Sequence, residues 1–282
     1  MKISNKLQKL QTSLTKKQRV VLLVLVAAAV LGLLTATVFR SNIASMLRWM
    51  TYSQANDNFA HNAQSSSLFL GMEDNLLICT QTQIQLVSPT GVSRLKESVS
   101  MKSPALNSSG NYAVVYDVGG QELRLIGQDA VLHSLTLPAE ETFLCATVNE
   151  KGWVAVTTKI SGYKGVVTVY NRDFSPVLTI RLSSRYISDA VVTPDCRGVY
   201  LISPGQADGA FENTLLYYTF SSREKPTRTI SLGSNVVLSI RSAGRCWIMG
   251  DRSLLILDSS GVITGSYDYE DRYLKLFYEQ TN

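Results

Sequence analysis

The stretch Leu106-Asn-Ser-Ser-Gly-Asn-Tyr-Ala-Val-Val115 decides the fold, because variants of it recur along the chain. Each copy ends one apolar strand, makes a polar turn whose Gly or Asn tolerates a positive φ, and begins a second apolar strand. The second strands are expected to begin near Leu76, Tyr112, Trp153, Val199 and Cys246. These starts are 36, 41, 46 and 47 residues apart, and an all-strand repeat of that length is typical of β-propeller blades.

Two further strands complete each repeat. The third strands are short apolar runs, expected at Ile84–Val87, Leu123–Ile126, Val166–Tyr170, Leu215–Thr219 and Leu254–Leu257. A fourth strand alternates apolar and polar residues, as at Val177–Leu182 and Val262–Gly265. The sequence therefore predicts an all-β, β-propeller-like domain of about five four-stranded repeats over residues 66–282. A β-sandwich is the alternative, although sandwiches do not repeat a four-stranded unit in this way.

One segment leaves the closure of the ring open. Residues 271–282, which include the run Tyr273–Tyr278, align with residues 184–195 and match the first strand of a sixth repeat. Either the ring is incomplete, or this strand joins the first repeat and ties the two ends together. We expect the incomplete ring, because residues 67–71 already supply the innermost strand of the first repeat.

Residues 20–39 contain no charged side chain, and a helix of that length crosses the roughly 30 Å of a bilayer core. We expect a transmembrane helix over residues 20–40, in contact with membrane lipid, between a basic tail at 1–19 and a juxtamembrane linker at 41–65. Six basic residues precede the helix and two closely follow it, so the N-terminus should be cytoplasmic and the C-terminal domain extracytoplasmic. A cleaved signal peptide and a buried core helix are the alternatives. This run is long for either, and it lacks a small-residue cleavage site.

The basic net charge comes from the N-terminal region. The chain has 27 Lys+Arg and 22 Asp+Glu, a net charge of +5. Eight of the basic residues lie at or before Arg48, whereas every acidic residue lies at or after Asp57, so the remainder carries 19 − 22 = −3. This distribution argues against a nucleic-acid partner, which would need a basic binding surface.

The four cysteines, Cys79, Cys145, Cys196 and Cys246, fall in or beside strands of different repeats. An even number outside the cytoplasm permits disulfides, and their redox state stays open. We favour free thiols in small apolar sites, because the spacings are wide.

The sequence offers no set of residues with a known catalytic spacing. His61 and His133, the two histidines, have no partner at metal-ligand spacing. Nucleophile-elbow, Cys-x-x-Cys and phosphate-loop motifs are also missing from the sequence. Adjacent carboxylates such as Glu140 and Glu141 are expected in solvated turns. We therefore predict no catalytic, cofactor-binding or metal-binding residues and do not expect an enzyme.

Residues 205–213 form the longest insertion in any repeat and are expected to be a loop. Propellers carry function on loops that exceed what a hairpin needs. Asp208, Phe211 and Glu212 are therefore the candidate contacts with a partner.

The turn in Leu106–Val115, together with Thr193-Pro-Asp195, resembles the blades of TolB-like and WD40-like propellers. The layout of basic tail, helix and strand-rich domain, with the segment Tyr267–Lys275, resembles an uncharacterised family of single-pass membrane proteins from Firmicutes. The resemblance implies a fold and a location at the cell surface, and it implies no chemistry.

These features predict a membrane-anchored extracytoplasmic propeller that acts as a binding or scaffold module for a protein or an envelope glycan. Two alternatives stay open. One is a propeller hydrolase acting on envelope glycans, which would need carboxylates converging near the central channel. The other is a ligand-sensing membrane protein, which would need a membrane partner because its cytoplasmic tail is short.

Overall fold

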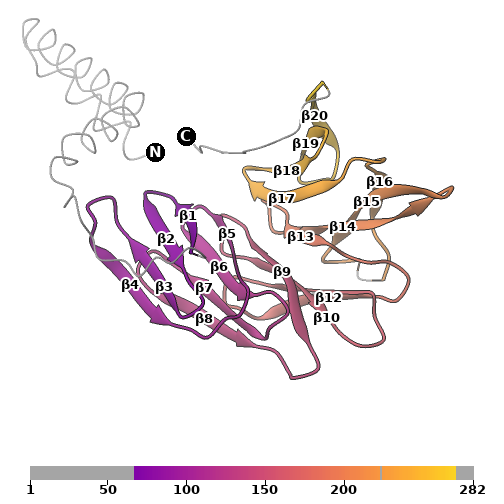
Figure 1. Ribbon diagram of the computed structural model, residues 1–282. Helices are drawn as coiled ribbons and strands as arrows, with labels where there is room; N and C mark the ends of the chain where they lie inside the picture. The colour runs from indigo at the N-terminus through magenta and orange to yellow at the C-terminus, as the bar shows by residue number, and fades with distance from the viewer. Residues whose placement is uncertain (1–66, 223, 271–282) are drawn as a thin grey trace, which may run out of the picture. The chain divides into compact units, whose positions relative to one another are not determined.

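The computed structural model describes residues 67–222 and 224–270. The predicted tail, transmembrane helix and linker, and the strand expected at 273–278, lie outside these residues. Within them, all regular structure is β-strand, and no helix is long and apolar enough to span a membrane. Twenty strands form five four-stranded antiparallel sheets, each built from four consecutive strands (Figure 1). We call these sheets blades 1 to 5.

The strand bounds follow the order of the chain. Blade 1 holds β1 (Leu68–Met72), β2 (Asn75–Cys79), β3 (Gln83–Val87) and β4 (Ser93–Ser98); blade 2 holds β5 (Pro104–Ser109), β6 (Tyr112–Asp117), β7 (Glu122–Ile126) and β8 (Val131–Thr136); blade 3 holds β9 (Thr142–Val148), β10 (Val154–Lys159), β11 (Gly165–Tyr170) and β12 (Pro176–Leu182); blade 4 holds β13 (Asp189–Val192), β14 (Gly198–Ala207), β15 (Ala210–Thr219) and β16 (Arg228–Ser231); blade 5 holds β17 (Val237–Ala243), β18 (Arg245–Gly250), β19 (Ser253–Leu257) and β20 (Ile263–Asp268).

The predicted fold class is confirmed. The second strand of every blade begins within one residue of its expected start. The repeat was visible because the middle strands are apolar on both faces. In β6, Ala113 and Val115 pack toward blade 1, whereas Val114 and Tyr116 pack toward blade 3. A strand buried on both faces has a continuous apolar run instead of an alternating one.

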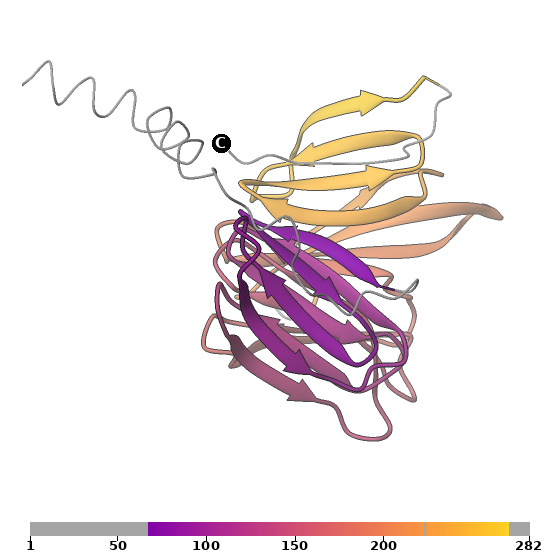
Figure 2. The ribbon, with the colours of Figure 1, turned by 60° about the vertical axis from the view of Figure 1, so that its left-hand side comes forward.

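Four apolar clusters hold the blades together, one between each consecutive pair. The cluster between blades 3 and 4 includes Val169 and Leu201, and the cluster between blades 4 and 5 includes Tyr200 and Ile248. Figure 2 shows blades 1 and 5 at the two ends of this series. Among the residues that the structure describes, no fifth cluster joins blade 5 to blade 1.

The first strands of the blades lie side by side and run in the same direction. Near the C-terminal ends of β5 and β1, Ser108 Oγ donates a hydrogen bond to Gly71 O at 2.8 Å. Asn107 Oδ1 accepts one at 3.0 Å from the backbone N–H of Val148, the last residue of β9. Because every sheet is antiparallel, each blade then presents the same connections at the same end.

Two ends of the blades can therefore be defined. The linker face carries the connections between second and third strands and the linkers from one blade to the next, at 99–103, 137–141, 183–188 and 232–236. The turn face, at the opposite end, carries the turns that follow the first and third strands.

All four cysteines are free thiols, as favoured from the sequence, and each belongs to a different blade. Cys79 and Cys246 are buried, whereas Cys145 and Cys196 are partly exposed. Cys196 occupies the turn after β13 with a φ of 59°.

Candidate binding face

The segment 205–213 is a hairpin, and the expectation of a loop was wrong. β14 and β15 are ten residues each and pair continuously from Gly198 and Thr219 to Ala207 and Ala210. Asp208 and Gly209 form the turn between them, with φ values of 50° and 80°. Positive φ at both central residues defines a type I′ turn, for which Asp-Gly is a preferred sequence.

This hairpin extends beyond the rest of blade 4. β13 pairs with β14 only as far as Ile202, and β16 pairs with β15 only as far as Thr214. From residue 204 to residue 212 the backbones of the two strands pair only with each other, and we call this part the ribbon. The ribbon projects from the linker face, on the right in Figure 1, and its residues 205–211 are all exposed.

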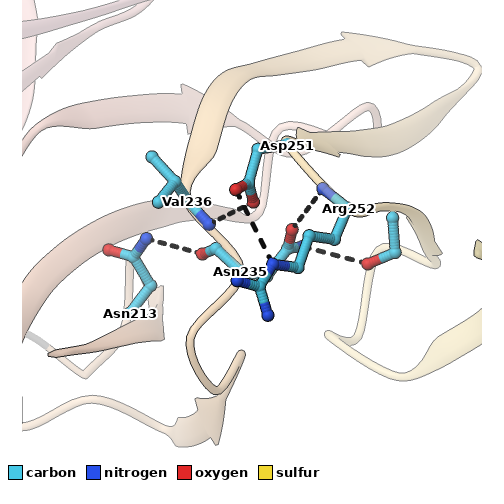
Figure 3. A network of polar contacts seen from close by, with 6 residues as sticks. Asn213, Asn235, Val236, Asp251 and Arg252 are labelled. Atoms are coloured by element: carbon cyan, nitrogen blue, oxygen red, sulfur yellow. Dashed lines mark hydrogen bonds and ion pairs between the residues drawn. The ribbon is translucent and has the colours of Figure 1, made fainter. Parts of the chain in front are cut away.

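A buried amide network fixes the base of the ribbon (Figure 3). Asn213 Nδ2 donates to the backbone carbonyl of Asn235 at 2.8 Å, and the Asn213 backbone bonds to Leu232 and Gly233 at 2.8 and 2.9 Å. Both asparagine side chains belong to buried residues. The ribbon is thereby attached to the linker between blades 4 and 5 and cannot swing freely about its base.

The same network continues into blade 5. Asn235 Oδ1 accepts a hydrogen bond from the Arg252 N–H at 3.2 Å, and Asn235 Nδ2 donates to Ser253 Oγ at 3.0 Å. Asp251 Oδ1 accepts from the Val236 N–H at 2.7 Å (Figure 3). One side chain, Asn235, therefore couples the linker to the turn between β18 and β19.

The three residues predicted to contact a partner share the ribbon but do not share one face. Phe211 lies on the same side of β15 as Asn213 and Leu215, and Leu215 packs toward blade 5. Glu212 lies on the opposite side and accepts a hydrogen bond from Ser231 Oγ. Asp208 lies in the turn itself. Phe211, with 43% of its surface exposed, is the large exposed apolar side chain of the ribbon, and its contact with a partner stays a prediction.

Of the fourteen large apolar side chains exposed among the described residues, nine lie at or near the linker face, spread over all five blades. Single exposed apolar residues are ordinary, whereas a group on one face indicates an interaction surface. Those at or near this face are Leu68, Phe69, Val118, Leu144, Tyr163, Tyr186, Phe211, Val236 and Leu238. The turn face and the outer strands carry the others, Val92, Leu132, Val262, Ile263 and Tyr267.

A half-buried carboxyl group connects the first strands of three blades beneath this face. Asp189, at the start of β13, accepts hydrogen bonds from the Cys145 thiol of β9 at 3.0 Å and from the Ile240 N–H of β17 at 3.3 Å. The Tyr116 hydroxyl lies 3.8 Å from the Cys145 sulfur. This cluster is hard to recognise from the sequence, because a single Asp within an apolar strand is the only local signal.

Burial controls the protonation of this cluster. It raises the pKa of the Asp189 carboxyl above its ordinary value, against the opposing effects of hydrogen bonds from Cys145 and backbone N–H groups and of nearby Arg241. Burial also raises the pKa of the Cys145 thiol, and the Asp189 charge adds to that shift. The thiol therefore stays protonated at neutral pH and serves as a hydrogen-bond donor instead of a nucleophile.

The described residues contain no group of three or more His, Cys, Asp or Glu side chains that could hold a metal ion. His133 lies in β8, and its ring stacks on Phe174 with 5.0 Å between centroids. His61 lies outside the described residues.

The chain belongs to a protein family of unknown function, DUF5711, whose model matches residues 48–282. No curated protein matches the sequence. Similar solved structures include apo AztD from Citrobacter koseri (13% identity over 73% of this chain and 60% of that chain, TM-score 0.46). Another is the β-propeller domain of Myceliophteria thermophila Cps50 (Swd1), with 12% identity over 71% of this chain and 67% of that chain and a TM-score of 0.48. A third is Kluyveromyces lactis Hsv2p, with 12% identity over 73% of this chain and 74% of that chain and a TM-score of 0.47. The chain thus spans about three fifths of the AztD chain.

Proposed function

We propose that this protein is a membrane-anchored, extracytoplasmic β-propeller that acts as a binding or scaffold module for a protein or an envelope glycan. The linker face would be its contact surface, and the ribbon its principal contact. The membrane anchor is the apolar segment 20–40, with the basic N-terminal tail in the cytoplasm.

The ribbon is the observation that carries the proposal. It extends past the sheet that would suffice for folding, and its outer residues 205–211 are exposed. Its base is nevertheless held by Asn213 and Asn235. A projection that is already ordered loses little conformational entropy when a partner binds, which favours affinity.

Shortening the ribbon tests its role. Deleting Gln206, Ala207, Ala210 and Phe211 removes two residue pairs and keeps the Asp-Gly turn, the strand register and the alternation of faces. Proteins cross-linked to the wild-type chain in intact cells are purified in detergent and quantified. We expect the principal cross-linked partner to be lost from the shortened variant and reduced in Phe211→Ser.

Leu132→Ser is the matched control. Leu132 is also 43% exposed and lies on a strand, but it belongs to the outer strand of blade 2, away from the linker face. It should retain the partner at the wild-type level. Equal recovery with all variants would contradict a contact role for the ribbon.

A separate experiment tests the membrane topology. Cysteine is introduced at Ser66 or at Ser13 in a chain whose partly exposed Cys145 and Cys196 have been replaced by serine. A membrane-impermeant maleimide should label the Ser66→Cys chain in intact cells and the Ser13→Cys chain only after permeabilisation. The reverse pattern would rule out the proposed orientation.

A further inference from the structure

Two connections of blade 3 meet on the linker face. One is the turn at 160–164 between β10 and β11, and the other is the linker at 183–188 from β12 to blade 4. The Lys164 N–H donates to the Leu182 carbonyl at 2.8 Å, which brings the end of the turn beside the start of the linker. Ile187 is buried against Gly165, where a Cβ would lie 2.6 Å from Ile187 Cγ1. The linker is therefore folded back over the start of β11.

Two tyrosines are exposed at this meeting point. Tyr163 is 42% exposed and Tyr186 is 60% exposed. The Lys164 ammonium lies 5.2 Å from the centroid of the Tyr186 ring, within the range of a cation–π interaction. This contact joins the two connections through side chains and holds a cation and an aromatic ring next to each other.

Positive charge accompanies both tyrosines. Lys159 and Lys164 are exposed at the two ends of the turn, and Arg185 is exposed in the linker. Within the part of the chain that the structure describes, none of the three forms an ion pair with a carboxylate. Neither connection contains an acidic residue. Three exposed cations therefore lie on or beside these two connections, and none of them is paired with a carboxylate of the described residues.

We propose that Lys159, Tyr163, Lys164, Arg185 and Tyr186 form a binding site for an anionic glycan, one whose sugars carry phosphate or carboxylate groups. We call this set the basic tyrosine patch. It rests on the proposed function, because it names the glycan class that the linker face would take. It is nevertheless separate from the ribbon, which lies on blade 4.

The combination of side chains favours a glycan over other anions. Arg and Lys recognise phosphate and carboxylate oxygens through charge-assisted hydrogen bonds. Exposed tyrosine rings add apolar faces against which the C–H faces of sugar rings can stack. A nucleic-acid binder, by contrast, presents a broad basic surface along the phosphate backbone, whereas the residues after Arg48 carry a net charge of −3.

The experiment compares two double variants of the full chain purified in detergent. Lys164→Gln/Arg185→Gln removes two charges from the patch. Lys151→Gln/Arg172→Gln removes two exposed charges from the turn face of the same blade. The probes are a phosphorylated mannan, the unphosphorylated mannan and polygalacturonate, with binding measured by interferometry at low and physiological salt.

We expect the wild type and the turn-face variant to bind the phosphorylated mannan or polygalacturonate equally, and not the neutral mannan. The patch variant should bind the same anionic glycan at least about tenfold more weakly than the wild type. Tyr186→Ser should weaken glycan binding, whereas Tyr186→Phe should bind like the wild type, because phenylalanine keeps the ring. Equal losses in both double variants would show a general effect of charge and overturn the proposal.

Two further probes test other anions. Patch-dependent binding to vesicles containing anionic phospholipid, or to single-stranded oligodeoxythymidine, that is tighter than to any glycan would also overturn the proposal. The ribbon experiment is independent of all these results. If the shortened-ribbon variant loses the cross-linked partner but the wild type binds no anionic glycan, only the basic tyrosine patch is refuted. If the wild type binds the glycan through the patch but the shortened-ribbon variant keeps the cross-linked partner, only the role of the ribbon is refuted.

Discussion

Replacing Gly250 with alanine should break the contacts by which Asn235 couples the linker between blades 4 and 5 to the turn between β18 and β19. Gly250 is the last residue of β18, and a Cβ built there lies 2.1 Å from Asn235 Oδ1 and 2.3 Å from Asn235 Nδ2. These atoms bond to the Arg252 N–H and to Ser253 Oγ. The added methyl group therefore displaces a buried amide from both of its partners.

The cost follows from those two hydrogen bonds. Each buried polar group that loses its partner costs about 1–3 kcal/mol, so the loss of both bonds should lower the free energy of unfolding of Gly250→Ala by about 2–6 kcal/mol. Removing the Asn235 side chain, which the new methyl group would contact, should abolish that cost. In an Asn235→Ala background we expect Gly250→Ala to change stability by less than about 0.5 kcal/mol, a coupling characteristic of residues in contact.

Urea denaturation of the purified chain, followed by tryptophan fluorescence, measures all four members of this cycle. Trp247 lies in β18 itself and should report the transition of blade 5. If Gly250→Ala is as costly in the Asn235→Ala background as in the wild type, Asn235 is not the reason that this position needs glycine. The account of how Asn235 couples this linker to blade 5 would then be wrong.

Three other predictions concern buried contacts. Asp189→Asn should remove a pH dependence of stability. A carboxyl whose folded pKa is raised stabilises the protein below its ordinary pKa, and that contribution is lost as the pH rises through the folded pKa. In denaturation series from pH 4 upward, the free energy of unfolding should therefore fall less steeply for Asp189→Asn than for the wild type or the exposed control Asp129→Asn. Gly165→Ala should push Ile187 away and lower both the melting temperature and glycan binding, with partial recovery of both in Gly165→Ala/Ile187→Ala. Burial raises the pKa of Cys79 to about 12, so a thiol reagent at pH 8 should modify Cys79 only at the rate of unfolding, as mass spectrometry of timed samples would show.

The middle strands of this domain could be predicted because they are buried on both faces, so that several consecutive residues are apolar. In Ala113-Val114-Val115 the side chains point alternately into two different apolar clusters, so the strand is apolar throughout. The ribbon could not be recognised in this way. Residues 205–211 are exposed on both faces and have no apolar pattern, and only the Asp208-Gly209 dipeptide signals the hairpin.

The position of the insertion could be predicted from the sequence, and its contact with a partner stays a prediction. Asp208, Phe211 and Glu212 were placed on one insertion, and the structure shows that insertion to project from the linker face. Their distribution over two faces depended on recognising the strand, since successive residues of a strand point in opposite directions. The basic tyrosine patch was missed because residues 159–164 and 185–186 are brought together only by the pairing of β11 with β12.

The difference between the two faces explains why the fold was more visible than the site. On the turn face, short polar side chains hydrogen-bond to the N–H groups of their own turns; these are Ser88, Asn149, Asn171, Thr193 and Asp258. The N–H groups of Val262 and Ser260 and the Ser260 hydroxyl hold the pKa of the Asp258 carboxyl below its ordinary value, so the charge itself stabilises the turn. Such turns need particular residues at particular positions, and they recur from blade to blade as the motif by which the repeat is detected. The linker face also has such bonds, as from the Gln83 N–H to Thr80 Oγ1 and from the Val236 N–H to Asp251 Oδ1, but its connections differ in length and composition from blade to blade. When the repeats are aligned, such segments appear only as gaps. The ribbon, and the tyrosines and cations on which recognition would depend, lie in or beside these segments.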